Sequence, residues 1–108
     1  MGGKVSQSQL WIGMVELKPV KRPESGPAGA FTNIVTWAVD KDSFRAKAEV
    51  IAAKLDRYVV EIENPEPLTS RFRNGGMDEE IEDMVRRAEA NPNAIVYGTF
   101  HNYRRDEA

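Results

Sequence analysis

Four segments of the chain are rich in apolar, β-branched or aromatic residues and are predicted to be strands, which are residues 10–18, 31–40, 57–63 and 94–103. In residues 57–63 apolar and polar residues also alternate with a period of two, the period at which side chains alternate across a β-strand. The first two segments are expected to pair as a hairpin with a long connection. In residues 10–18 both alternating sets are mostly apolar, which predicts a central strand that is covered on both faces.

Two other segments repeat apolar residues at the spacing of one helical face. The first helix is expected to follow Asp42 or Ser43 as its N-cap, with the stripe Phe44, Ala48, Ile51, Ala52 and Leu55. The second carries the stripe Met77, Ile81, Met84, Val85 and Ala88. Between the helices, residues 64–67 (NPEP) are expected to end the third strand. Residues 68–76 could form an edge strand, a helical turn or an irregular loop.

The order of these elements predicts an α+β fold. We expect a four- or five-stranded, mainly antiparallel sheet with both helices on one face. If residues 68–73 form a strand, residues 31–103 have the order of a ferredoxin-like plait, preceded by an extra N-terminal strand; that architecture hosts many unrelated functions. Residues 10–103 are predicted to be a single domain, residues 1–9 a disordered N-terminus and residues 104–108 a charged tail.

Composition narrows the classes of function. The 108 residues have a net charge of -2, no cysteine and one histidine. Disulfides, zinc–thiolate sites and multi-histidine metal cages within one chain are therefore excluded. The acidic balance disfavours nucleic acid as a partner. The first nine residues lack the apolar region of a signal peptide, and the apolar runs are far shorter than the ~20 residues that span a membrane. We expect a soluble cytoplasmic protein without a cofactor or a metal.

Two helices on one face would leave the other face of the sheet open. Val60, Ile62, Val96 and Phe100 are expected in the core beneath the helices. The open face is predicted to carry Tyr97, Thr99, His101 and Tyr103, joined by Glu61 and Glu63, and by either Trp11, Val15 and Leu17 or Leu10, Ile12 and Met14. Trp11 and Trp37 are candidate contact residues. Since uncovered apolar patches mark contact surfaces, a homodimer through the open face or a sheet edge is predicted.

The candidate chemistry centres on His101. A carboxylate from Glu61 or Glu63 could orient its imidazole as a general base, with Tyr97, Thr99 and Tyr103 beside it. The alternative is an ordinary histidine at an interface. Arg71 and Arg73, together with other basic residues at the rim, could bind a small anionic ligand.

The pattern favours a non-enzymatic, homodimeric binding or interaction module. One alternative is a small cofactor-independent enzyme of the plait type that uses His101 and the tyrosines. A second alternative is an accessory or immunity-like protein that binds a basic partner. An enclosed pocket containing His101 would favour the enzyme, a flat self-complementary surface the homodimer, and an exposed acidic groove the basic partner.

Overall fold

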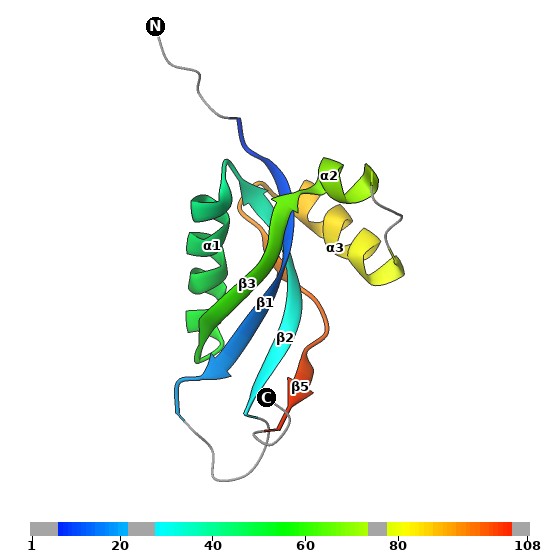
Figure 1. The fold of residues 1–108 in the computed structure, drawn as a ribbon. Helices are drawn as coiled ribbons and strands as arrows, with labels where there is room; N and C mark the ends of the chain where they lie inside the picture. Colours follow the sequence, from blue (N-terminus) through cyan, green and yellow to red (C-terminus); the bar gives the residue numbers. More distant parts are fainter. Residues whose placement is uncertain (1–6, 22–27, 74–77, 105–108) are drawn as a thin grey trace, which may run out of the picture.

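The computed structural model describes residues 7–21, 28–73 and 78–104, which form one sheet with helices packed on it (Figure 1). The elements are β1 (Gln9–Pro19), β2 (Gly29–Ala38), α1 (Lys41–Lys54), β3 (Arg57–Pro67), α2 (Leu68–Arg73), α3 (Glu79–Glu89), β4 (Ile95–Tyr97) and β5 (His101–Tyr103). The strand order is β3-β1-β2-β4, with β5 also paired to β2, and the described pairings are antiparallel. The predicted α+β class and five-stranded antiparallel sheet are therefore confirmed.

The two long helices lie on opposite faces of the sheet, with α1 on one side and α2 and α3 on the other (Figure 1). On the α1 side, Phe44, Ala48 and Ala52 pack against residues such as Trp11 and Ile34. On the α3 side, the apolar stripe of the helix packs against Leu10, Ile12 and Val35, with Leu68 of α2 beside them; the stripe residues are Ile81, Met84, Val85 and Ala88. The prediction of both helices on one face is wrong, because each alternating apolar set of β1 and β2 has its own helix.

The helices begin where short acidic side chains can accept a backbone hydrogen bond. Asp40 caps α1, with the Ser43 amide donating to its Oδ1 at 2.7 Å, so the predicted cap at Asp42 or Ser43 is wrong. Asp78 caps α3 in the same way, with the Ile81 amide donating to its Oδ1 at 2.9 Å. The predicted stripe residue Met77 lies outside the described residues. Among the described helices, none is both long and apolar enough to cross a membrane.

Strand β3 does not end at residues 64–67, as the sequence suggested, but continues through them to Pro67. Its pairing with β1 shifts register twice. Leu17 pairs with Val59 and Glu16 with Glu61, so Val60 is an extra residue, which is a β-bulge. As a result Val59 and Ile62, rather than Val60 and Ile62, pack on the α1 side. Val60 is 39% exposed, so its predicted place in the core is wrong.

The last predicted strand is two short strands separated by residues 98–100. Tyr97 pairs with Ile34 of β2, whereas His101 pairs with Phe31, so four steps along the chain match three steps along β2. This extra residue reverses which side the following residues face. Val96 therefore packs on the α3 side and Phe100 on the α1 side, and their predicted place in one core is wrong.

Residues 68–73 form the short helix α2, which resolves the alternatives that the sequence left open. The strand that a ferredoxin-like plait would need between the two long helices is therefore absent from this described segment. With one long helix on each face as well, the ferredoxin-like arrangement is not confirmed. The central strands β1 and β2 contribute buried residues to both faces of the sheet.

Candidate binding face and pocket

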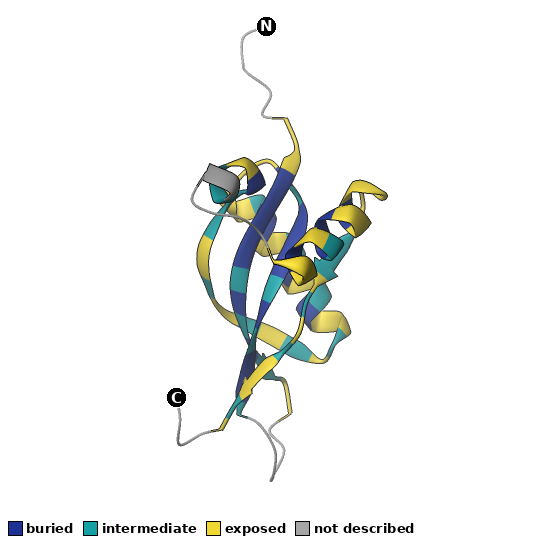
Figure 2. Cartoon of the chain, turned by 90° about the vertical axis from the view of Figure 1, so that its right-hand side faces the viewer, coloured by how far each residue is buried: buried dark blue, intermediate teal, exposed yellow. Residues whose placement is uncertain are grey.

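Half of the α3 side of the sheet extends beyond the described helices. Figure 2 views the molecule from this side, with α3 over the upper part of the sheet and exposed or half-buried strand residues below it. Strand register places a set of side chains together here, and we call it the open half-face: Met14, Glu16, Lys18, Phe31, Asn33, Tyr58, Glu61, Glu63, His101 and Tyr103. Directly paired residues of neighbouring strands point to the same side, so this set follows from the pairing alone.

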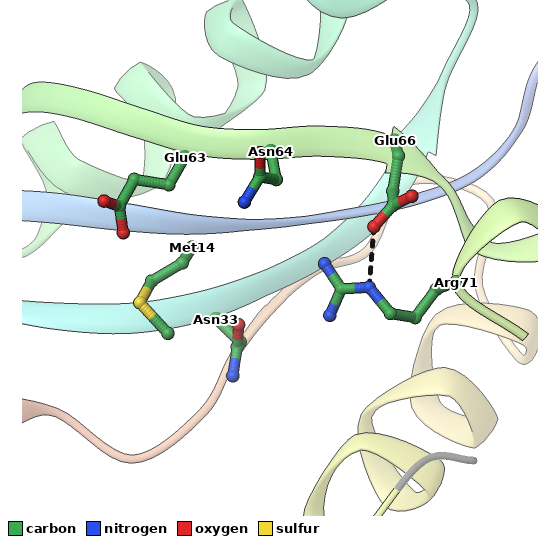
Figure 3. Close-up of a pocket in the computed structure, with 6 residues that line it drawn as sticks. All are labelled: Met14, Asn33, Glu63, Asn64, Glu66 and Arg71. Carbon is green, nitrogen blue, oxygen red and sulfur yellow. Dashed lines mark hydrogen bonds and ion pairs between the residues drawn. The ribbon is translucent and has the colours of Figure 1, made fainter. Parts of the chain in front are cut away.

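A pocket of about 510 Å³ lies where the open half-face meets α2. Its lining comes from three strands and the helix: Met14, Asn33, Glu63, Asn64, Glu66 and Arg71 (Figure 3). Met14 is opposite both Asn33 and Glu63 in the strand pairing, so these three side chains form one row across the sheet. The pocket is open to solvent, and its lining is mostly polar.

The second bulge of β3 positions the acidic side chains of this pocket. Glu63 pairs with Met14 and Glu66 with Ile12, so Asn64 and Pro65 occupy the interval that Gly13 fills on β1. In a regular strand, residues three apart point to opposite faces. The bulge places Glu63 and Glu66 on the same face. Asn64 makes this turn with φ 48°, in the left-handed region that asparagine tolerates better than most residues.

Glu66 and Arg71 form an ion pair at one end of the pocket. The Arg71 Nε donates to Glu66 Oε2 at 2.7 Å, and the two side chains are only 29% and 25% exposed. Figure 3 shows the terminal nitrogens of Arg71 directed into the pocket, with Glu63 at the opposite end and Asn33 and Asn64 between them. Within the described ranges, the side chains of Glu63, Asn33 and Asn64 make no hydrogen bond or ion pair. These groups are available to a ligand.

Tyr103 and Phe31 form the aromatic part of the open half-face. Their ring centroids lie 5.4 Å apart. The Tyr103 hydroxyl donates a hydrogen bond to Glu16 Oε2 across β2. Burial, with the hydrogen bond and the negative charge of Glu16, raises the pKa of Tyr103 to about 12. The Tyr103 side chain lies over Gly29, where an added Cβ would collide with the hydroxyl oxygen, so only glycine leaves room for it.

Carboxylates dominate the charge of this region. Glu16, Glu61, Glu63 and Glu66 lie on the open half-face or in the pocket, whereas the described cations there are Lys18 and Arg71. Arg71 is already paired with Glu66. The combination of carboxylates with half-buried aromatic rings is suited to a cationic ligand, since aromatic faces and carboxylates both attract positive charge.

The structure brings some of the predicted site residues together. His101 and Tyr103 share the open half-face with Glu61 and Glu63, as the sequence suggested. His101 is exposed and pairs with Phe31, but it does not line the pocket. Arg71 is in the pocket. Arg73 is the last residue of α2, and its side chain lies outside the described part of the structure.

The remaining predicted residues lie elsewhere. Tyr97 pairs with Ile34, whose side chain is in the α1-side core, and its ring packs at 5.6 Å from Phe100. Thr99 is bound to α3, because its amide and its hydroxyl both donate to Glu80 Oε2. The predicted grouping of Tyr97 and Thr99 with His101 is therefore wrong.

The two tryptophans lie on opposite sides of the sheet. Trp11 is buried on the α1 side, 6.5 Å from the Phe44 ring, and its Nε1 has no hydrogen-bond partner among the described residues. Trp37 packs on the α3 side, where its Nε1 donates to the Ala88 carbonyl at 2.8 Å. Both indoles therefore contribute to packing between the sheet and a helix.

Met14 belonged to one of the two sets that the sequence offered for the open face, but sequence reasoning missed Asn33, Asn64 and Glu66 as parts of a site. Asn33 could have been found, because it is the one polar residue between Phe31 and Val35 on an alternating apolar set. Asn64 and Glu66 could not, since their orientation depends on a bulge that alternation does not reveal.

The chemical groups of this site are hydrogen-bond donors, hydrogen-bond acceptors and charged side chains. In the described ranges, no group of three or more His, Asp or Glu side chains is arranged to hold a metal ion. The pocket offers carboxylate and amide oxygens as acceptors and the Arg71 guanidinium and amide nitrogens as donors. Comparison with protein-family models, with curated proteins and with solved structures finds no match for this chain.

Proposed function

We propose that this protein is a binding module that receives a basic segment of a partner protein on its open half-face. The observation that carries the proposal is the alignment of Glu16, Glu61 and Glu63 on one side of the sheet, on strands that no described helix covers there. An extended or irregular segment rich in Lys or Arg would place its cations against these carboxylates. Its aliphatic stems would lie on Phe31, Met14 and Tyr103.

A second copy of the chain is a weaker occupant of this surface. The homodimer stays a prediction. The sequence predicted it from a whole uncovered face, whereas in the described part of the chain a helix packs on each face of the sheet. A two-fold contact through the open half-face would bring the same carboxylates, among them Glu16 and Glu61, against each other. Like charges across an interface are unfavourable, so the acidic character supports a different, basic partner.

The enzyme and the anionic-ligand hypotheses receive less support. His101 is exposed and outside the pocket, so the enclosed histidine site that an enzyme of the predicted kind would need is not formed by the lining residues. An anionic ligand would have to enter a region where Glu16, Glu61 and Glu63 outnumber the described cations. Three hypotheses followed from the sequence. An exposed acidic groove was the feature expected for the one in which the protein binds a basic partner.

Binding of a defined probe tests the proposal. The full chain, labelled with ¹⁵N, is titrated with a short Lys–Ser peptide that has a free carboxyl terminus, and with an Asp–Ser peptide of equal length. We expect the basic peptide alone to shift the amide signals of open half-face residues such as Phe31 and His101, with binding that weakens as salt screens the charges. Shifts confined to α1, or equal binding of both peptides, would overturn the proposal.

Charge reversal supplies the matched control. The double variant Glu61→Lys and Glu63→Lys should weaken binding of the basic peptide by about tenfold or more. Glu49→Lys changes an exposed carboxylate on α1, remote from the open half-face, and should leave binding unchanged. Sedimentation at micromolar concentration should give the mass of one chain; a dimer that the Glu61 and Glu63 reversal dissociates would instead support the second copy as the occupant.

A further inference from the structure

We infer that the pocket beside Arg71 captures the carboxyl-terminal residue of the basic segment, and that this residue is a lysine or an arginine. The inference rests on the proposed function and names the part of the partner that the pocket recognises. It follows from the two opposite charges at the ends of the pocket, with Arg71 at one end and Glu63 at the other (Figure 3).

Arg71 has donors available for a carboxylate. Among the described residues, Glu66 is the partner of its Nε, and the two terminal nitrogens point into the pocket. The guanidinium is planar and presents its donors as a rigid fork, so a hydrogen bond at Nε fixes the direction of the others. Because the ion pair with Glu66 is about three-quarters buried, the fork is held in place before a ligand arrives. A terminal carboxylate fits this arrangement as a bidentate partner.

Glu63 supplies the opposite end. Its carboxylate is exposed and makes no ion pair with a described residue. Glu63 pairs with Met14, and Glu66, the partner of Arg71, pairs with Ile12, so the backbones of Glu63 and Glu66 are separated by two residues of β1, or ~7 Å along the strand. That span is comparable to the length of the four-carbon lysine stem. A terminal Lys or Arg can place its carboxylate at Arg71 and its side-chain cation at Glu63, with the stem over Met14.

Charge balance favours a terminal residue that carries both signs. Glu63, Glu66 and Arg71 together have a net charge of about −1, so an anion alone would meet repulsion. A terminal Lys or Arg is neutral overall, because the carboxylate and the side-chain cation cancel. Asn33 and Asn64 lie between the ends, and their side-chain amides can pair with the last peptide group.

Peptides that differ only at the carboxyl terminus test this inference. The probes are the Lys–Ser peptide ending in a free Lys, the same peptide with a C-terminal amide, and one whose last Lys is replaced by Ser. We expect amidation to weaken binding by about tenfold and the Lys-to-Ser change to weaken it by a similar factor. Equal affinity of the free and amidated peptides would overturn the inference while leaving the proposed function intact; no binding by any peptide would instead overturn the proposed function.

Variants of the pocket tie each effect to its residue. In Arg71→Met, amidation should change the affinity less than twofold, because the group that distinguishes carboxylate from amide is gone. In Glu63→Gln, the Lys-to-Ser change should lose most of its effect. Arg71→Lys keeps the charge without the fork and should retain part of the preference for the free carboxylate. Thermal unfolding of each variant confirms that it folds, and an unchanged amidation effect in folded Arg71→Met would refute the assignment.

Discussion

The Tyr103 hydroxyl donates a hydrogen bond to Glu16, which joins the last strand of the chain to the first across β2. Since β5 has only three residues, this contact, the packing of the Tyr103 ring on Phe31 and the few β2–β5 backbone bonds hold it in place. The Tyr103 side chain therefore contributes two of the contacts that hold β5 at the edge of the open half-face.

Removal of this hydroxyl should loosen β5 without unfolding the protein. Tyr103→Phe is expected to lower the free energy of unfolding by about 1 kcal/mol, because a hydrogen bond to a carboxylate is lost while the ring remains. Urea unfolding followed by circular dichroism measures the change. Tyr97→Phe is the control, since no described hydrogen bond involves the Tyr97 hydroxyl, and it should be neutral. Equal effects of the two variants would contradict the role assigned to the Glu16 contact.

The same contact makes the stability sensitive to alkaline pH. The pKa of Tyr103 is about 12 in the folded protein, against 10.0 ordinarily, because burial and Glu16 favour the neutral phenol. The stabilisation is fully present below about pH 10 and is lost as the pH rises towards 12. The difference in unfolding free energy between the parent protein and Tyr103→Phe should therefore shrink across that interval. A difference that stays constant would show that Tyr103 titrates normally.

Strand β3 shows where sequence patterns succeed and where they fail. Alternation correctly identified the strand and the solvent-facing Glu61 and Glu63, because between its bulges β3 follows the period of two. Alternation failed at Val60, since one inserted residue exchanges the faces on either side of it. The second bulge, at Asn64 and Pro65, contains residues that ordinarily end a strand, so the pocket it forms was not predictable from propensity.

Substitutions at the first bulge and two residues after it test this register. Val60→Thr is expected to change the free energy of unfolding by less than about 0.5 kcal/mol, because Val60 is substantially exposed. Ile62→Ala should cost about 2 kcal/mol, since Ile62 packs against the α1-side core. Chemical denaturation of both variants provides the comparison. A larger loss of unfolding free energy for Val60→Thr than for Ile62→Ala would contradict the bulge and support an uninterrupted alternation.

The apolar pattern of the central strands indicated that helices cover both faces of the sheet. Both alternating sets of β1 are mostly apolar, which predicts a strand buried on both faces, whereas the number of helices predicted cover on one face only. The set that begins at Leu10 packs under α3 and the set that begins at Trp11 under α1. The number of helices alone cannot decide their sides, because each connection can cross either face. The apolar sets of the central strands were the better guide.

Gly13 lies where the Phe44 side chain of α1 packs closely against the sheet. A Cβ at this position would lie 2.9 Å from Phe44 Cε2 and 3.3 Å from Ile62 Cγ2. Gly13→Ala should therefore destabilise the protein by about 1–3 kcal/mol through overpacking. Combined with Phe44→Leu, its cost should fall below the sum of the single effects, whereas combination with Ile51→Val should be additive. Additivity with both partners would mean that the Phe44 ring does not limit the space.

The N-cap of α1 can be located by substitution. Asp40→Ala is expected to cost about 1 kcal/mol, because the Ser43 amide loses its acceptor. Asp40→Asn should retain most of the stability, as asparagine also caps well. Ser43→Ala leaves the backbone donor in place and should cost less than about 0.5 kcal/mol. Thermal unfolding distinguishes the cap found in the structure from the one that the sequence suggested.

The placement of α1 and α3 on opposite faces has a consequence for folding during synthesis. Strands β1, β2 and β3 and helix α1 are contiguous in residues 9–67, so the main contacts of the α1-side core are complete before α3 is made. The α3-side core joins Leu10, near the start of the chain, to Ala88 and must close last. We expect the nascent chain to pass through a partly folded state in which Ile12 and Val35 are still exposed, so that the final third of the sequence acts as the cover of a preformed sheet.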